Sequence, residues 1–253
     1  MSGDAGADAS IAREIAGAEA IVFDAGNTLL SINYGVIAEA LRESGIAVDA
    51  AAVRDAEWRA RPTFDARLAT LRSTETASAF RAYCDAVFER LAVPPGPSAD
   101  AAYERVRAYN AAQNLWDAPI PGAREAVRDV ARAGYAVGVV SNSRGTIEAH
   151  LRSLGLADDL ACVVDSGVVG VEKPDPRVFA IAAERLRVAP ERAVYVGDLY
   201  SVDVAGARGA GWRAILVDPA GAWERADCAR VRDVGRLRDA VVALGSRARE
   251  RRT

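Results

Sequence analysis

The sequence predicts an α/β protein, in which a parallel sheet carries an all-helical unit inserted after the first strand. Two observations support this fold class. From about residue 117 onward, short apolar runs alternate with helical segments of about 10 to 15 residues, which is typical of βαβ crossovers. Residues 33–116 show helical periodicity and no convincing buried strand.

The first element of the sheet is the apolar run Ala20–Phe23, which ends at Asp24 and the Gly26-Asn27 turn. Asp24 should therefore lie at the carboxyl end of a strand, where open parallel sheets bind ligands. Residues 1–18 carry no recognisable chemistry, and we expect a flexible arm or a fraying helix there.

Four helices are expected in the inserted unit. Gly45 can end the first, Asp49 and Thr74 can cap the second and third, and Pro62 should bend or split the second. The expected ranges are 36–44, 50–71, 74–91 and 99–115.

The remainder of the sheet should come from residues 117–245, which together with 19–32 form the core. Strands are expected over 136–141, 161–164, 193–196 and 214–217. Helices are expected over 121–132, around His150, over 177–187 and over 202–209. The Arg-rich end, 246–253, is most simply a solvated tail.

Composition narrows the class of partner. The chain of 253 residues has 32 basic and 35 acidic residues, which disfavours a nucleic-acid or membrane-surface protein. We see no secretory signal or membrane span, and Cys84, Cys162 and Cys228 fit reduced thiols in a cytoplasmic protein. A small soluble substrate is the better expectation.

The single lysine, Lys173, is notable because the other 31 basic residues are arginine. It indicates a place where a compact ammonium is needed. Polar residues also follow the ends of the expected strands, namely Asp24, Ser141 and Asp198, with Asp203 close by. Such carboxylates suit Mg²⁺, and a hydroxyl with an ammonium suits phosphoryl oxygens. A nucleophilic carboxylate would form a covalent aspartyl intermediate.

Four segments resemble motifs of the haloacid dehalogenase-like hydrolases, and they occur in that family's order. They are residues 23–29 (FDAGNTL), 139–143 (VVSNS), 172–176 (EKPDP) and 196–198 (VGD) with Asp203 five residues later. The resemblance implies a Rossmann-like core (19–32 and 117–245) with a helical cap (33–116). It also implies an Mg²⁺-dependent phosphatase that acts on a small phosphorylated metabolite.

The same resemblance implies roles for individual residues. Asp24 would be the nucleophile, and Ser141 and Lys173 would complete the catalytic set and hold the phosphoryl oxygens. The phosphate-binding group would also include Asn142 and Thr28. Magnesium would be held by Asp24, the Gly26 carbonyl and Asp198, with Asp203 supporting the cation or Lys173.

One position departs from the family pattern. Phosphatases of this family usually carry a second aspartate two residues after the nucleophile as general acid and base, and here that residue is Gly26. Loss of a general acid typically costs about 100- to 10,000-fold in rate. Asn27 does not titrate, and Tyr34 or Tyr200 would be speculative substitutes.

The missing aspartate leaves other functions open. A 2-haloacid dehalogenase would not need a proton for a halide leaving group, and Trp58-Arg59 resembles a halide-binding element. The presence of Asp198 argues against a dehalogenase, because displacement of a halide from carbon does not need a carboxylate that binds a metal ion. A weakly catalytic or non-catalytic protein that binds a ligand or partner is the third alternative. A homodimer is compatible with the sequence, which leaves the substrate and the oligomeric state open.

Overall fold

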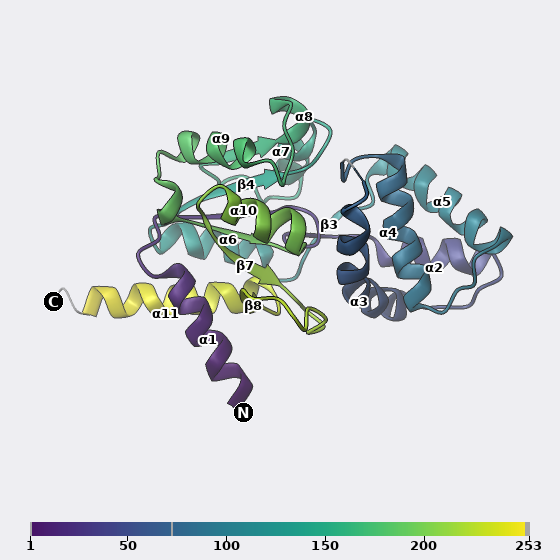
Figure 1. Cartoon of the computed structure of the whole chain (residues 1–253), viewed down its shortest axis with the longest axis horizontal. Coiled ribbons are helices and arrows are strands. Elements are labelled where there is room, and N and C mark those ends of the chain that lie inside the picture. The colour runs from purple at the N-terminus through teal and green to yellow at the C-terminus, as the bar shows by residue number, and fades with distance from the viewer. Residues whose placement is uncertain (1, 72, 251–253) are drawn as a thin grey trace.

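The computed structural model describes residues 2–71 and 73–250, and it confirms the expected α/β fold class. The core is a six-stranded parallel sheet in the order β5-β4-β1-β6-β7-β8 (Figure 1). Its strands are β1 Ala20–Phe23, β4 Ala136–Ser141, β5 Cys162–Asp165, β6 Ala193–Gly197, β7 Arg213–Val217 and β8 Ala229–Val231.

Helices cover both faces of the sheet. One face packs against α1 Ser2–Ile15, α6 Ala123–Arg132, α7 Ile147–Ser153 and α11 Val234–Glu250. The other packs against α9 Pro176–Leu186, α10 Ala205–Gly209 and the π-helical turn η2 Tyr200–Val204. The short elements α8 Ser166–Val169 and η1 Pro190–Arg192 complete this unit.

The central strand β1 is buried on both faces, which explains its continuous apolar run. Ile21 and Phe23 belong to one hydrophobic cluster, and Val22 belongs to the cluster on the opposite face. Successive side chains of a strand point to opposite faces, so both layers draw on this strand.

The inserted unit, which we call the cap, consists of four helices with their own hydrophobic core. These are α2 Tyr34–Glu43, α3 Ala50–Leu68, α4 Ala77–Arg90 and α5 Pro97–Gln113. The chain enters the cap after β2 Leu30–Ser31 and returns through β3 Ala118–Pro119, and these two strands pair in an antiparallel ribbon. Figure 1 shows the cap beside the core, joined to it by this narrow connection.

Several local expectations change. Pro62 lies inside an uninterrupted α3 and does not split it, although its missing N–H removes one helical hydrogen bond. Thr76, rather than Thr74, caps α4: its hydroxyl accepts a hydrogen bond from the Ala79 amide at 3.1 Å.

The two ends of the chain are helical. At residues 1–18, where we expected a flexible arm or a fraying helix, the chain forms α1, and Ile11 and Ile15 of this helix are buried against the sheet. Helix α11 extends to Glu250 into the expected tail of 246–253, and residues 251–253 lie outside the described part of the chain.

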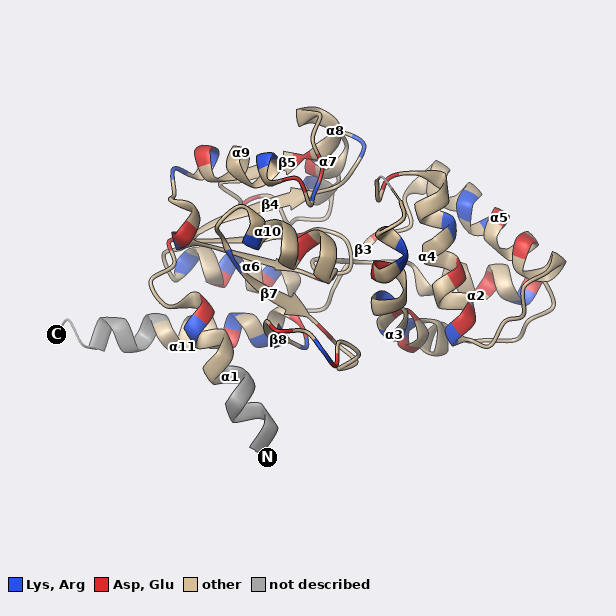
Figure 2. Cartoon of the chain, in the orientation of Figure 1, with Lys and Arg blue, Asp and Glu red and all other residues tan. Residues whose placement is uncertain are grey.

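Charge is spread over both units. Figure 2 shows basic and acidic segments interspersed on the core and on the cap, in agreement with the small net charge of −3. Within the described residues, no helix has the length and apolarity required to span a lipid bilayer.

Candidate active site

The carboxyl edge of the sheet gathers the polar residues expected there. Asp24 directly follows β1, Ser141 is the last residue of β4, and Asp198 directly follows β6. Lys173 lies between α8 and α9. Because β1, β4 and β6 are adjacent and parallel, their ends bring these residues to one rim.

Lys173 is the centre of this group. Its Nζ donates to Asp24 Oδ1 at 2.5 Å, Asp203 Oδ1 at 2.8 Å and the Tyr195 hydroxyl at 2.8 Å. Its side chain is only 3% exposed. Burial alone would lower the pKa of Lys173, but the carboxylates of Asp203 and Asp24 hold it well above its usual value. The lysine is therefore a fixed buried cation.

Asp203 binds the lysine on one side and the loop after β6 on the other. Its Oδ2 accepts hydrogen bonds from the amides of Asp198 at 3.0 Å and Leu199 at 2.9 Å. Gly197 allows this approach, because a Cβ there would lie 2.4 Å from Asp203 Cγ. Both oxygens of Asp203 thus position the residues around them.

Asp24, Asp198 and Asp203 form a compact cluster of acids. One carboxylate oxygen from each lies within 4.8 Å of the others. Burial raises the pKa of Asp24 to about 6, although Lys173 opposes the change. Burial also raises the pKa of Asp198 well above its usual value. Such a cluster of oxygen ligands is able to hold a hard cation.

The cap supplies a second buried cation that the sequence did not single out. Arg61 of α3 is 2% exposed, and its Nε and Nη2 donate to Glu57 at 2.8 and 3.0 Å. Its Nε also lies 3.7 Å from Asp198 Oδ2. The signal was a Glu–Arg pair four residues apart on the apolar face of a helix. Arg59, the residue expected to resemble a halide ligand, is exposed on the same helix.

Two of the expected phosphate-binding residues lie close to this cluster. Ser141 is 5% exposed and lines the cavity above Asp24. The Asn142 amide nitrogen donates to the Lys173 carbonyl at 3.0 Å and to Thr74 Oγ1 at 2.9 Å, and its Oδ1 accepts from the Lys173 amide at 2.8 Å. The Asn142 side chain therefore joins the Lys173 loop to the cap.

Thr28 does not fit the expected role. It is fully buried in the turn after β1, its hydroxyl has no hydrogen-bond partner among the described residues, and it is absent from the cavity wall. The turn directs this side chain into the protein interior, so it is not positioned to contact a ligand in the cavity.

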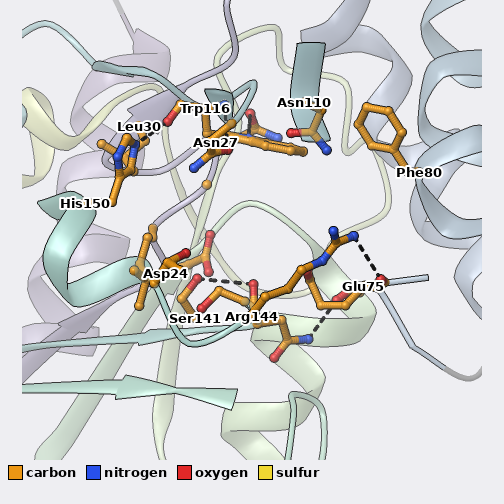
Figure 3. Close-up of a pocket in the computed structure, with 18 of the residues that line it drawn as sticks. Asp24, Asn27, Leu30, Glu75, Phe80, Asn110, Trp116, Ser141, Arg144 and His150 are labelled. Carbon is orange, nitrogen blue, oxygen red and sulfur yellow. Dashed lines mark hydrogen bonds and ion pairs between the residues drawn. The ribbon is translucent and has the colours of Figure 1, made fainter. Parts of the chain in front are cut away.

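The site opens into a cavity of about 690 Å³ between core and cap, shown in Figure 3. The core contributes Asp24, Ser141 and Lys173, and the cap contributes Phe80 and Asn110. Its size and its combination of apolar and polar walls are typical of small-molecule sites.

Gly26 is packed against the indole of Trp116. A Cβ at residue 26 would lie 3.1 Å from Trp116 Nε1, and this Nε1 donates to Asn27 Oδ1 at 3.0 Å. His150 Nε2 lies 2.7 Å from the Trp116 carbonyl, which can only accept, so Nε2 donates. The single histidine of the chain, His150, thus holds Trp116 at the connection between core and cap.

A further pair in the cavity wall was missed by the sequence analysis. Glu75 of the cap lies 3.6 Å from Arg144 of the core, and Arg144 Nη2 also donates to the Glu75 carbonyl at 3.4 Å. Burial raises the pKa of Glu75 to about 7 despite Arg144. Glu75 had no motif to mark it, because its position depends on the docking of the cap.

Comparisons with known proteins give relatives with phosphatase names. A phosphoserine phosphatase of Thermus thermophilus is 38% identical over 124 residues, 49% of this chain and 50% of that protein. A glyceraldehyde 3-phosphate phosphatase of Methanopyrus kandleri is 34% identical over 134 residues, 53% of this chain and 57% of that protein. The chain thus matches about half the length of these relatives.

Solved structures show the same fold at low identity. One, a dehalogenase with an intermediate complex, has a TM-score of 0.58 and 20% identity, with 87% of this chain and 96% of the other covered. Another, a phosphatase from Thermococcus onnurineus, has a TM-score of 0.53 and 24% identity, with the same coverage. The family model for haloacid dehalogenase-like hydrolases matches residues 18–211, and the chain belongs to this family of hydrolases.

Proposed function

We propose that this hydrolase is an Mg²⁺-dependent phosphatase, which cleaves a small phosphorylated metabolite through a phosphoryl-Asp24 intermediate. The observation that carries the proposal is the contact of Asp24 with Lys173 inside an acidic cluster at the floor of a cavity. The phosphatase names of the two sequence relatives support the same reaction class.

The charge of the buried cluster favours a divalent cation. Four carboxylates, those of Asp24, Asp198, Asp203 and Glu57, stand against two cations, Lys173 and Arg61, so the formal balance is minus 2. Asp24, Asp198 and the Gly26 carbonyl would hold Mg²⁺, which when bound would neutralise charge on a phosphoryl group. Asp203 would support this arrangement through Lys173.

The remaining roles follow from position. Asp24 would attack phosphorus with one carboxylate oxygen, while Lys173 and the Ser141 hydroxyl would bind phosphoryl oxygens. The cap would cover the cavity and restrict the entry of water. Asn142 would hold the loop of Lys173 in place through its two hydrogen bonds to the Lys173 backbone.

The test is a panel of phosphate monoesters assayed with Mg²⁺ and with EDTA. We expect turnover with Mg²⁺, little with EDTA, and loss of turnover in Asp24→Asn. Asp55→Asn is the matched control, because Asp55 is an exposed carboxylate of the cap that pairs with Arg54. Turnover that survives Asp24→Asn would exclude Asp24 as the nucleophile.

A second function, dehalogenation, has one observation in its favour, the absence of a carboxylate at Gly26. A halide leaves without a proton, so that reaction needs no acid there. The same enzyme is therefore assayed with a 2-chloro acid in the presence of EDTA. Chloride release, with no turnover of any phosphate ester, would replace our proposal with a dehalogenase. Ligand-induced stabilisation without any turnover would instead indicate a binding protein.

A further inference from the structure

The proposed reaction needs a proton donor on the cap side of the site. In phosphoryl transfer, the attacking and leaving oxygens lie roughly in line on opposite sides of phosphorus. Asp24 approaches from the sheet edge, and the cap forms the other wall of the cavity. A leaving alcohol oxygen therefore faces the cap, and a group that protonates it has to reach it from there.

Residue 26 cannot provide this proton. Glycine has no titratable side chain, and the space beside it is filled by the Trp116 indole, 3.1 Å from where a Cβ would lie. Trp116 itself is held by its hydrogen bond to Asn27 and by His150. The donor has to come from another part of the cavity wall.

Glu75 lies on a segment of the cap that docks directly onto the catalytic loops. Ser73 Oγ donates to Glu172 Oε2 at 3.0 Å, and Thr74 Oγ1 accepts from Asn142 at 2.9 Å. Glu172 and Asn142 are the chain neighbours of Lys173 and Ser141. Segment 73–75 is therefore docked on the loops that carry Lys173 and Ser141, and Glu75 lines the same cavity as these residues.

In Figure 3, Glu75 of the cap lies next to Arg144, and Arg144 lies next to Ser141. Arg144 holds Glu75 from the core side, with Nε 3.6 Å from Oε2 and with a hydrogen bond to the Glu75 carbonyl. Glu75 is therefore kept at the cavity by contacts from two core loops.

The other titratable residues that line the cavity are held by other contacts or are weak acids. Lys173 and Asp203 bind each other, and Asp198 belongs to the acid cluster. His150 donates its Nε2 proton to the Trp116 carbonyl. Burial raises the pKa of Tyr83 well above its usual value, which makes its hydroxyl a weak proton donor. Tyr34 and Tyr200, considered from the sequence, are not among the cavity residues.

We propose that Glu75 is the general acid and base of the reaction, supplied by the cap in place of the residue absent at position 26. This inference rests on the proposed phosphatase function. As the bond between Asp24 Oδ and phosphorus forms, the bond to the ester oxygen breaks, and that oxygen takes the Glu75 proton and leaves as an alcohol. A water then attacks phosphorus and gives a proton to Glu75. The Asp24 carboxylate and phosphate are released, and Glu75 is again protonated.

The electrostatics of Glu75 agree with this role. Burial raises its pKa from 4.5 to about 7, Arg144 lowers it, and Glu172, Asp165 and Asp24 raise it. A group with a pKa near the working pH is suited to both give and take a proton. The alkaline limb of the rate profile for an alkyl phosphate should therefore lie near pH 7, because the acid is lost above its pKa.

The test compares Glu75→Gln with wild type on two substrates, an alkyl phosphate and an aryl phosphate whose phenol is acidic. We expect kcat for the alkyl ester to fall by about 100- to 10,000-fold. The aryl ester, whose leaving group needs no proton, should change less than about 10-fold in its first step. The alkaline limb should disappear with the alkyl ester. Glu89→Gln, at an exposed cap carboxylate that pairs with Arg67, is the control.

A second variant tests the titration itself. Arg144→Gln removes the cation that lowers the Glu75 pKa, so the alkaline limb of the rate profile should move to higher pH. Glu75→Asp keeps a carboxyl group at this position and should retain an alkaline limb. Equal losses in the first step on both esters in Glu75→Gln, measured as formation of the phosphoryl enzyme, or an unchanged limb in Arg144→Gln, would overturn the inference. If wild type and Glu75→Gln turn over both esters at the same rates, the role of Glu75 is refuted and the proposed function stands. Turnover in Asp24→Asn would instead refute the proposed function.

Discussion

Lys173 brings together charges that could not be buried separately. It contacts Asp24, Asp203 and Tyr195 with one ammonium group, and its side chain is almost fully enclosed. A planar guanidinium directs its donors in one plane, whereas an ammonium presents three donors around a point. This geometry gives a physical reason for a lysine at the one position where this arginine-rich chain has one.

We predict that Lys173→Met lowers the free energy of unfolding by about 3–5 kcal/mol at neutral pH, because it leaves buried carboxylates without their cation. Urea denaturation measures the change. Arg177→Met removes the exposed partner of Asp175 and should cost less than about 1 kcal/mol. Equal costs for the two variants would show that Lys173 is not the cation that balances the cluster.

Helix α3 connects the cap to the loop after β6 at two points one turn apart. Arg61 approaches Asp198, and Asp65 Oδ1 accepts from the Ser201 amide at 2.9 Å and from its hydroxyl at 2.8 Å. Residues four apart lie on the same helix face, so one face of α3 reaches both positions. The position of the cap is thereby linked to the position of Asp198.

We predict that Asp65→Ala increases hydrogen exchange at the Ser201 amide, since this amide loses its acceptor. Amides within β6 should exchange as in wild type, because their bonds lie inside the sheet. Hydrogen-exchange mass spectrometry or NMR distinguishes the two segments. Unchanged exchange at Ser201 would mean that this contact does not hold α3 to the core.

The sequence predicted elements and strand ends better than contacts between units. The runs ending at Asp24 and Ser141 could be read because buried strands have a strong local pattern. The two-residue strands β2 and β3 are too short for such a pattern. Arg61 and Glu75 were missed because their roles depend on how the cap packs on the core. The burial of Thr28 away from the cavity could not be predicted for a related reason, since the direction of a side chain in a tight turn depends on local backbone geometry.

Across the whole molecule, the cap and core share one cavity over an acidic cluster. A cation that binds only the folded protein stabilises it by mass action, by about 2.7 kcal/mol at 100 times its Kd. We therefore predict that Mg²⁺ raises the Tm of wild type, because it relieves the excess negative charge. The increase should be lost in Asp198→Asn and kept in Asp55→Asn. An equal increase in all three proteins would place the bound ion elsewhere.

The most direct measurement of the central claim is the site of phosphorylation during turnover. The enzyme is mixed with an aryl phosphate and Mg²⁺, quenched in acid within one turnover, digested and analysed by mass spectrometry. The account predicts a phosphoryl group on Asp24 that is absent in Asp24→Asn. A phosphoryl group on another residue, such as Ser141, or turnover without any phosphorylated enzyme, would contradict it.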